Sequence, residues 1–121
     1  GSSTASQYIT KPVVLSNNST ALDIRLTQSV RDSAEVEVYW RVSSADEVRN
    51  INSLNWTPFN TDGRPDLPVT ASEADDDFRE YQYSQPNINS FTAFQIKLVL
   101  KGTNSSYPPI VRDLRGIALA I

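Results

Sequence analysis

The feature of this sequence that most constrains its fold is an alternation of apolar and polar residues with a period of two. The segment Glu35–Val42 is the clearest case, because an apolar side chain occupies every even position. A strand directs successive side chains to opposite faces, whereas a helix would spread these residues around its circumference. The segment is therefore predicted to be a strand. Its core-facing residues are Val36, Val38, Trp40 and Val42, and its outward-facing residues are Glu35, Glu37, Tyr39 and Arg41.

Similar patterns predict strands along most of the chain. The longer ones are Leu22–Val30, Glu35–Val42, Phe78–Tyr83, Phe91–Leu100 and Leu114–Ile121, and the shorter ones are Tyr8–Leu15, Asn55–Phe59 and a piece near Val69. Pro12 cannot donate a ladder hydrogen bond, so it places its strand at a sheet edge. In the C-terminal segment, Ile117, Leu119 and Ile121 alternate with Ala118 and Ala120, which indicates a strand packed on both faces.

No segment longer than about ten residues carries the apolar stripe of a helix, and Asp46–Ile51 has room for a single helical turn. Short strands separated by Asn, Ser, Pro and Gly are typical of an all-β fold, and we predict an antiparallel β-sandwich that is jelly-roll-like. The 121 residues fit one domain. Residues 1–7 are predicted to be a tag remnant and linker and residues 8–121 the sandwich. Gly1-Ser2-Ser3, without Met, indicates a domain excised from a longer protein.

The absence of His and Cys restricts the chemistry open to this chain. These residues supply the usual ligands of zinc and the usual general base of nucleophilic catalysis. Paired carboxylates are enough for a glycosidase, but such enzymes need a deep cleft, for which a sandwich of this size has little room. We therefore expect a protein that is not an enzyme.

The charge pattern argues against two classes of partner. The net charge is −3 and the Lys and Arg residues are scattered singly, so the clustered cations of a nucleic-acid interface are missing. No apolar stretch approaches the roughly 20 residues that span a bilayer, so no membrane insertion is expected.

A group of carboxylates in the connection 60–77 is a candidate calcium site. Its members are Asp62, Asp66, Asp75, Asp76 and Asp77. Calcium takes six to eight oxygen ligands, which clustered Asp residues in a loop can provide. The spacing differs from that of an EF-hand, and the alternative is a turn followed by a solvated acidic bend. No other cofactor is predicted.

Three aromatic residues are candidate contacts with a ligand or partner: Tyr39, Trp56 and Tyr107. Aromatic faces bind sugars, and Trp56 lies between two long connections. The structural alternative is that Trp56 and Phe59 plug one end of the sandwich. Tyr39 is expected on an outer face, either in a subunit contact or beside a cross-strand partner.

The second half of the chain contains three strand sequences of a recognisable kind: Phe78–Tyr83, Phe91–Gly102 and Pro108–Ala120, with Val38–Val42 and Trp56–Gly63 in agreement. Together these segments resemble virion structural proteins from tailed phages. The resemblance covers Ala21–Ile121 and is to baseplate, fibre and adhesin-type proteins of marine and cyanobacterial phages. It contains no catalytic or binding motif whose roles could be transferred.

This resemblance implies a C-terminal β-sandwich domain of the virion that takes part in tail or fibre assembly or in attachment to the host surface. Its partners would be other virion proteins or a host-surface glycan, and such proteins commonly form trimers. The alternative is a carbohydrate-binding module of a secreted glycan-active protein. A glycan module would bind polysaccharide as a monomer, whereas an assembly domain would oligomerise and bind no sugar alone.

Overall fold

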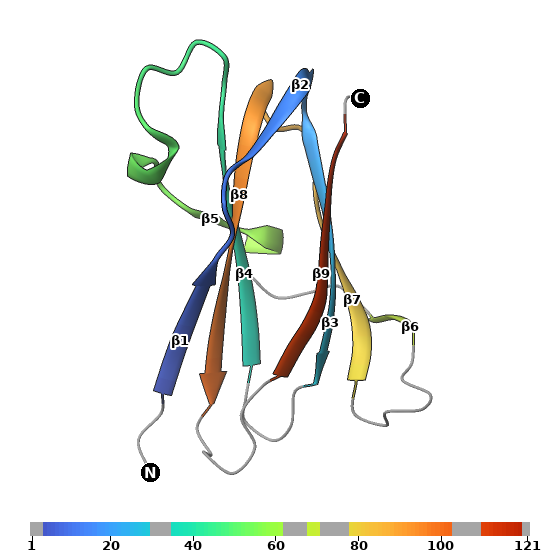
Figure 1. Cartoon of the computed structure of the whole chain (residues 1–121). Helices are drawn as coiled ribbons and strands as arrows, with labels where there is room; N and C mark the ends of the chain where they lie inside the picture. The colour runs from blue at the N-terminus through green and yellow to red at the C-terminus, as the bar shows by residue number, and fades with distance from the viewer. Residues whose placement is uncertain (1–3, 30–34, 62–67, 71–77, 103–109, 120–121) are drawn as a thin grey trace.

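The computed structural model describes residues 4–29, 35–61, 68–70, 78–102 and 110–119, and all its longer elements are strands (Figure 1). The strands are β1 (Thr4–Ile9), β2 (Val13–Ser19), β3 (Ala21–Ser29), β4 (Glu35–Ser43), β5 (Thr57–Pro58), β6 (Pro68–Thr70), β7 (Phe78–Gln85), β8 (Phe91–Gly102) and β9 (Ile110–Leu119). Two single 3₁₀ turns, η1 (Ile51–Ser53) and η2 (Phe59–Thr61), complete the elements. Among the described residues, no helix is long and apolar enough to cross a membrane.

The strands form two antiparallel sheets that pack face to face (Figure 1). Sheet A has the order β1-β8-β4-β5, and β2 continues along the same side of β8 as β1. Sheet B has the order β6-β7-β3-β9. The prediction of an all-β antiparallel sandwich is confirmed.

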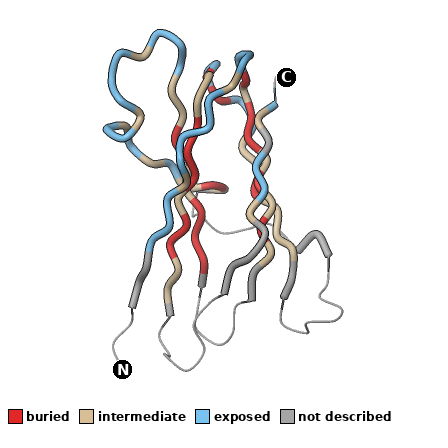
Figure 2. The backbone as a smooth tube through the Cα atoms, in the orientation of Figure 1, coloured by how far each residue is buried: buried red, intermediate tan, exposed pale blue. Residues whose placement is uncertain are grey.

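The core lies between the inner faces of the two sheets (Figure 2). In sheet A, Val38 is opposite Leu98, and in sheet B, Ile24 is opposite Tyr83, so each pair points to one face. All four side chains are almost fully buried. The alternation in β3, β4, β7 and β8 therefore predicted the correct inner faces.

Phe59 closes the space between the sheets from η2. Its ring is fully buried and makes edge-to-face contacts with Trp40, at 6.5 Å between ring centroids, and with Tyr83, at 6.0 Å. Asn60 follows with a φ of 53°, a left-handed conformation that Asn adopts more readily than most residues. Of the two residues that the structural alternative placed at one end of the sandwich, Trp56 and Phe59, Phe59 is buried between the sheets.

The N-terminal region differs from the prediction in two ways. Residues 4–7, predicted to belong to a linker, pair with β8 as the first part of β1. The strand predicted over Tyr8–Leu15 is interrupted, because Pro12 cannot donate a ladder hydrogen bond. At the interruption, the amide of Thr10 donates to the carbonyl of Ile96, and the Thr10 hydroxyl accepts from the Ile96 amide, both at 3.0 Å.

The C-terminal strand also differs from the prediction. Where its side chains are described, β9 packs on one face: Leu114 and Ala118 contact the core, whereas Arg115 is exposed and Leu119 is 41% exposed. The register explains this, because Gly116 lies opposite the core residue Ile24, so Leu114, Gly116 and Ala118 share the inner face. The other predicted residues of this strand, 120–121, lie outside the described residues.

Candidate functional site

The outer face of sheet A carries a patch of aromatic and charged side chains built on β4 and β8. Tyr39 pairs with Lys97, and Arg41 pairs with Gln95, so these four side chains share the face opposite the core. Trp56 reaches the same face from the connection between β4 and β5. We call the set Tyr39, Arg41, Trp56 and Lys97 the outer patch.

Arg41 anchors the connection 44–56 to the sheet. Its Nε donates to Oε1 of Gln95 at 2.8 Å, and its Nη1 donates to the carbonyl oxygens of Asn52 at 3.3 Å and Leu54 at 3.1 Å. Nη2 donates to Oδ1 of Asn52 at 3.3 Å. Burial lowers the pKa of Arg41, but a guanidinium remains protonated in proteins. The side chain therefore stays charged and satisfies backbone carbonyls that have no ladder partner.

Arg41 also fixes the position of Trp56. The guanidinium carbon of Arg41 lies 4.0 Å from the centroid of the Trp56 ring, which is a stacked cation–π contact. Trp56 is only partly buried, so the ring keeps surface that a ligand or partner can reach. A large, rigid ring held in this way loses little conformational entropy when it binds.

The ammonium group of Lys97 lies between two rings of the outer patch. Its Nζ is 4.8 Å from the centroid of Tyr39 and 5.1 Å from that of Trp56. Both contacts are within the range of a cation–π attraction. Lys97 therefore connects the two aromatic residues and adds a positive charge beside them.

A second polar contact continues the patch along β4. The Tyr39 hydroxyl donates to Oε1 of Glu37 at 2.8 Å, and Nζ of Lys101 lies 3.1 Å from the same oxygen. Glu37 is 9% exposed although its strand alternation directs it outward, because its neighbours cover it. These contacts hold the Tyr39 ring in one orientation.

The connection that carries Trp56 has its own local order. The Asn50 side chain accepts from the Asn52 amide at 2.9 Å and so caps η1. Arg49 donates to Glu47 from its amide, Nε and Nη2. This side-chain contact lowers the pKa of Glu47 to about 2. The single helical turn predicted over Asp46–Ile51 does not form there, and the 3₁₀ turn η1 overlaps that range only at Ile51.

The structure brings together two of the three aromatic residues predicted as contacts, Tyr39 and Trp56, around Lys97. Tyr39 lies on the outer face, as its position in the alternation predicts. Trp56 does not plug the core with Phe59, because it stacks on Arg41 outside sheet A. Tyr107 lies outside the described residues.

The candidate calcium ligands Asp62, Asp66, Asp75, Asp76 and Asp77 also lie outside the described residues. Within the part of the chain that the structure does describe, no group of three or more acidic residues is arranged to hold a metal ion.

Sequence reasoning placed Arg41 and Lys97 on outward faces but did not single them out. Arg41 and its partner Gln95 are 54 positions apart, and only the strand register brings them together. One sequence feature could have pointed to Arg41. The connection after β4 is long, and its carbonyl groups outside the ladders need hydrogen-bond donors, which a side chain of β4 can supply.

Comparison of the chain with protein-family models, with curated proteins and with solved structures found no match in any of the three. The chemistry of the outer patch is therefore the local evidence on function. It offers two ring surfaces and an ammonium group in a fixed arrangement, which suits binding.

Proposed function

We propose that this chain is a non-catalytic structural domain of a phage virion, which acts in tail or fibre assembly or in attachment to a host surface. The resemblance of its strand sequences to tailed-phage virion proteins supports the assignment to virion structural proteins. The observation that carries the binding role is the outer patch, in which Trp56 and Tyr39 are partly exposed and held around Lys97.

The patch has the features of a contact surface. Aromatic residues and Arg are enriched at protein interfaces, where they provide much of the binding free energy. The side chains here are ordered before binding, since Trp56 is stacked on Arg41 and Tyr39 is bonded to Glu37. Ordering of this kind reduces the entropy lost on association.

Self-association is the first test. Light scattering of the purified chain, with and without calcium, is expected to show an oligomer such as a trimer, and Trp56→Ala is expected to shift it toward monomer. Val48→Ala is the matched control, because Val48 lies on the same connection and is 96% exposed. A chain that stays monomeric and is indifferent to calcium would contradict the self-assembly form of the proposal.

A positioning role for Arg41 is tested separately. Arg41→Lys keeps the charge but loses the planar group that stacks on Trp56 and donates to the connection. We expect this variant to weaken association about as much as Trp56→Ala, while its circular-dichroism spectrum stays that of a folded β protein. Unchanged association in Arg41→Lys would show that the stack does not position Trp56 for binding.

The second candidate function is carbohydrate binding, and the exposed surface of Trp56 beside Lys97 favours it. A sugar ring stacks on an aromatic face, and an ammonium group adds a hydrogen-bond donor at its edge. A carbohydrate-binding module would remain a monomer and bind soluble polysaccharide with an affinity that Trp56→Ala lowers at least tenfold. Titration calorimetry with a panel of neutral and acidic polysaccharides distinguishes this function from assembly.

A further inference from the structure

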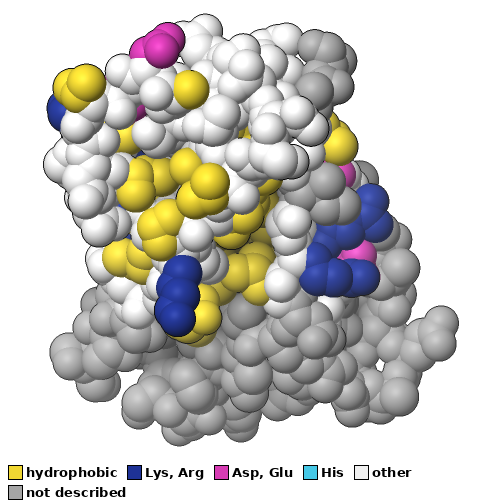
Figure 3. All heavy atoms as spheres, turned by 45° about the horizontal axis from the view of Figure 1, so that its top comes forward, with side chains coloured by type: hydrophobic (Ala, Val, Ile, Leu, Met, Phe, Trp, Pro, Cys, Tyr) yellow, Lys and Arg dark blue, Asp and Glu magenta, His cyan; other side chains and the backbone are white. Residues whose placement is uncertain are grey.

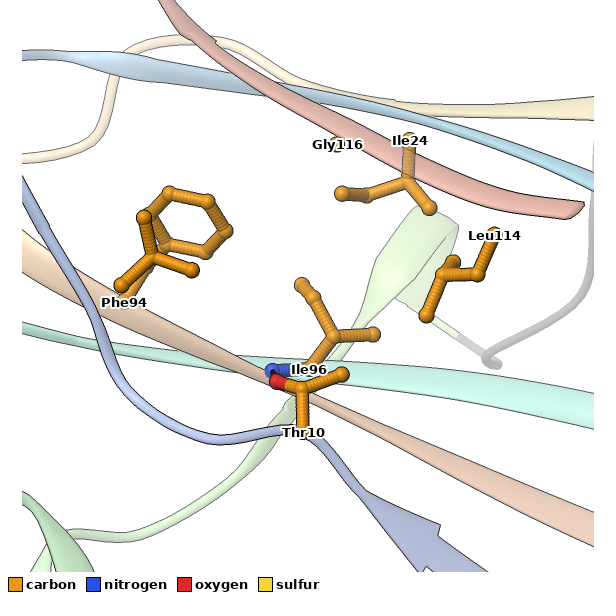
Figure 4. Close-up of a pocket in the computed structure, with 7 residues that line it drawn as sticks. Thr10, Ile24, Phe94, Ile96, Leu114 and Gly116 are labelled. Carbon is orange, nitrogen blue, oxygen red and sulfur yellow. Dashed lines mark hydrogen bonds between the residues drawn. The ribbon is translucent and has the colours of Figure 1, made fainter.

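One side of the sandwich is open between the edge of sheet A and the edge of sheet B. A cavity of about 200 Å³ lies there, lined by Thr10 and Val13 from the first edge, by Ile24, Phe94 and Ile96 from the core, and by Leu114 and Gly116 from β9. In Figure 4 the side chains of Phe94, Ile24, Leu114 and Ile96 surround the empty space. The lining is apolar except for Thr10, so the cavity suits an apolar group.

Two residues at the rim point inward yet remain exposed. Tyr8 pairs with Leu98 and Val13 pairs with Phe94, so both belong to the inner face of sheet A. Tyr8 is nevertheless 59% exposed and Val13 is 42% exposed. Figure 3 shows a band of hydrophobic side chains on this side of the molecule, with basic side chains beside it. No described strand therefore covers the inner face of sheet A at the edge formed by β1 and β2.

Both edges have unpaired backbone groups. Among the described strands, β2 pairs only with β8, and β9 pairs only with β3. The free edge of a strand presents N–H and C=O groups that a further extended segment can bind. Gly116, in β9, has no side chain, and a Cβ atom there would lie 2.9 Å from Cδ1 of Ile24. A larger residue at position 116 would therefore displace the Ile24 side chain, which also lines the cavity.

One exposed basic side chain lies at the rim. The rim segment 8–14 contains Lys11 and no acidic residue, whereas Arg115 of β9 pairs with Arg25 on the outer face of sheet B. Arg115 is bound to Glu80 at 3.2 Å, whereas Lys11 is exposed and makes no ion pair with a described residue. An occupant with a negative charge beside its apolar part complements this rim.

We infer that the opening between β2 and β9 binds an extended peptide segment of a partner protein, with one bulky apolar side chain in the cavity and an acidic residue beside Lys11. The size of the cavity supports one such side chain, since an engineered apolar cavity of about 150 Å³ in another protein holds a benzene molecule. The peptide adds to a free sheet edge through backbone hydrogen bonds, and its other side chains alternate between the opening and solvent. This site is separate from the outer patch, so the inference does not depend on the proposed function.

The test uses fluorescence anisotropy with two labelled peptides of about nine residues. Both alternate Thr and Val around a central Phe, and one has Asp at its ends while the other has Lys. We expect saturable binding of the Asp peptide and at least tenfold weaker binding of the Lys peptide. In Lys11→Glu, the preference for the Asp peptide is expected to be lost or reversed.

Two neighbouring residues supply a matched pair of variants. Val13→Asp places a charge in the cavity and is expected to weaken binding of the Asp peptide at least tenfold. Val14→Asp is the control, because Val14 is the next residue of the same strand, is 80% exposed and does not line the cavity. It carries the same charge and is expected to bind within about threefold of the unmodified chain.

Several results would overturn the inference. These are the absence of binding up to about millimolar peptide, equal losses in Val13→Asp and Val14→Asp, or equal affinity for the Asp and Lys peptides. A dimer in light scattering that Val13→Asp alone dissociates would also overturn it, because the occupant would then be a second copy of this chain.

Discussion

Trp56 and Phe59 are three residues apart, yet they occupy opposite faces of sheet A. Phe59 is fully buried between Trp40 and Tyr83, whereas Trp56 is partly exposed against Arg41. The short strand β5, Thr57–Pro58, lies between them at the edge of sheet A. The two aromatic residues therefore serve different purposes, one in stability and the other at the surface.

This difference predicts unequal effects on stability. Phe59→Ala removes a buried ring and leaves a cavity, so we expect the free energy of unfolding to fall by about 3–5 kcal/mol. Trp56→Ala loses a cation–π contact at a partly exposed site, for which about 1 kcal/mol is expected. Urea unfolding of both variants checks this. Equal losses would mean that Trp56 is a core residue after all.

A second prediction concerns the pH dependence of the Glu47–Arg49 contact. The Arg49 side chain lowers the pKa of Glu47 from its ordinary value of 4.5 to about 2, because it binds the ionised carboxylate. The stabilisation is therefore complete above about pH 4.5 and is lost as the pH falls toward 2. An NMR titration of the Glu47 carboxyl carbon is expected to show this low midpoint. In Arg49→Gln the midpoint should return toward 4.5, and a midpoint unaffected by this variant would exclude Arg49 as the cause.

At the scale of residues, the sequence predicted which face of a sheet a side chain occupies better than it predicted which side chains contact one another. Alternation placed Tyr39 outward and Trp40 inward, because the period of a strand fixes each side chain relative to its neighbour. It could not predict that Lys97 lies between Tyr39 and Trp56, since that depends on the register of β4 against β8. Register is a property of the whole sheet, so a single strand does not contain it.

Among the elements, β1 is the one that sequence reasoning missed in part. Residues 4–7 are Thr, Ala, Ser and Gln, which have no apolar alternation and read as a linker. Their pairing with β8 provides backbone hydrogen bonds along a strand that would otherwise be an open edge. Tertiary pairing here outweighs local sequence preference.

Deletion of residues 1–7 tests the role of this strand. It removes four of the six paired positions of β1, Thr4 to Gln7, and leaves one edge of β8 open there, while the other edge stays paired with β4. We expect the free energy of unfolding to fall by about 2 kcal/mol, from the backbone hydrogen bonds that are lost. Deletion of residues 1–3 alone is the control and should have little effect. If the longer deletion is also neutral, the segment behaves as the linker that its composition suggested.

The element β9 shows a different limit of sequence reasoning. Ile117, Leu119 and Ile121 form the bulkier face of its sequence, but the core receives Leu114 and Ala118. Gly116 pairs with Ile24 within sheet B, and its lack of a side chain leaves room for the Ile24 side chain beside the cavity. Hydrophobicity alone therefore predicted the strand but not the face that is buried.

For the whole molecule, the order of the strands in the sheets has a kinetic consequence. β1 pairs with β8, and β3 pairs with β9, so both sheets join segments that are distant in sequence. Proteins dominated by such pairings fold slowly, because loop closure precedes the contacts that compensate for it. We expect folding in about milliseconds to seconds, measured by stopped-flow fluorescence of the Trp residues. Complete folding within microseconds would be inconsistent with this topology.

The same topology determines how much of the chain must be synthesised before sheet A can form. β8 is the only described partner of β1 and β2 and the main partner of β4, and it begins at Phe91. Until that segment emerges, β1 and β2 have no described partner and β4 has only the two-residue strand β5, for several seconds at ordinary rates of translation. Those strands are candidates for protection by chaperones, and a fragment that ends before Phe91 is expected to aggregate when it is expressed alone.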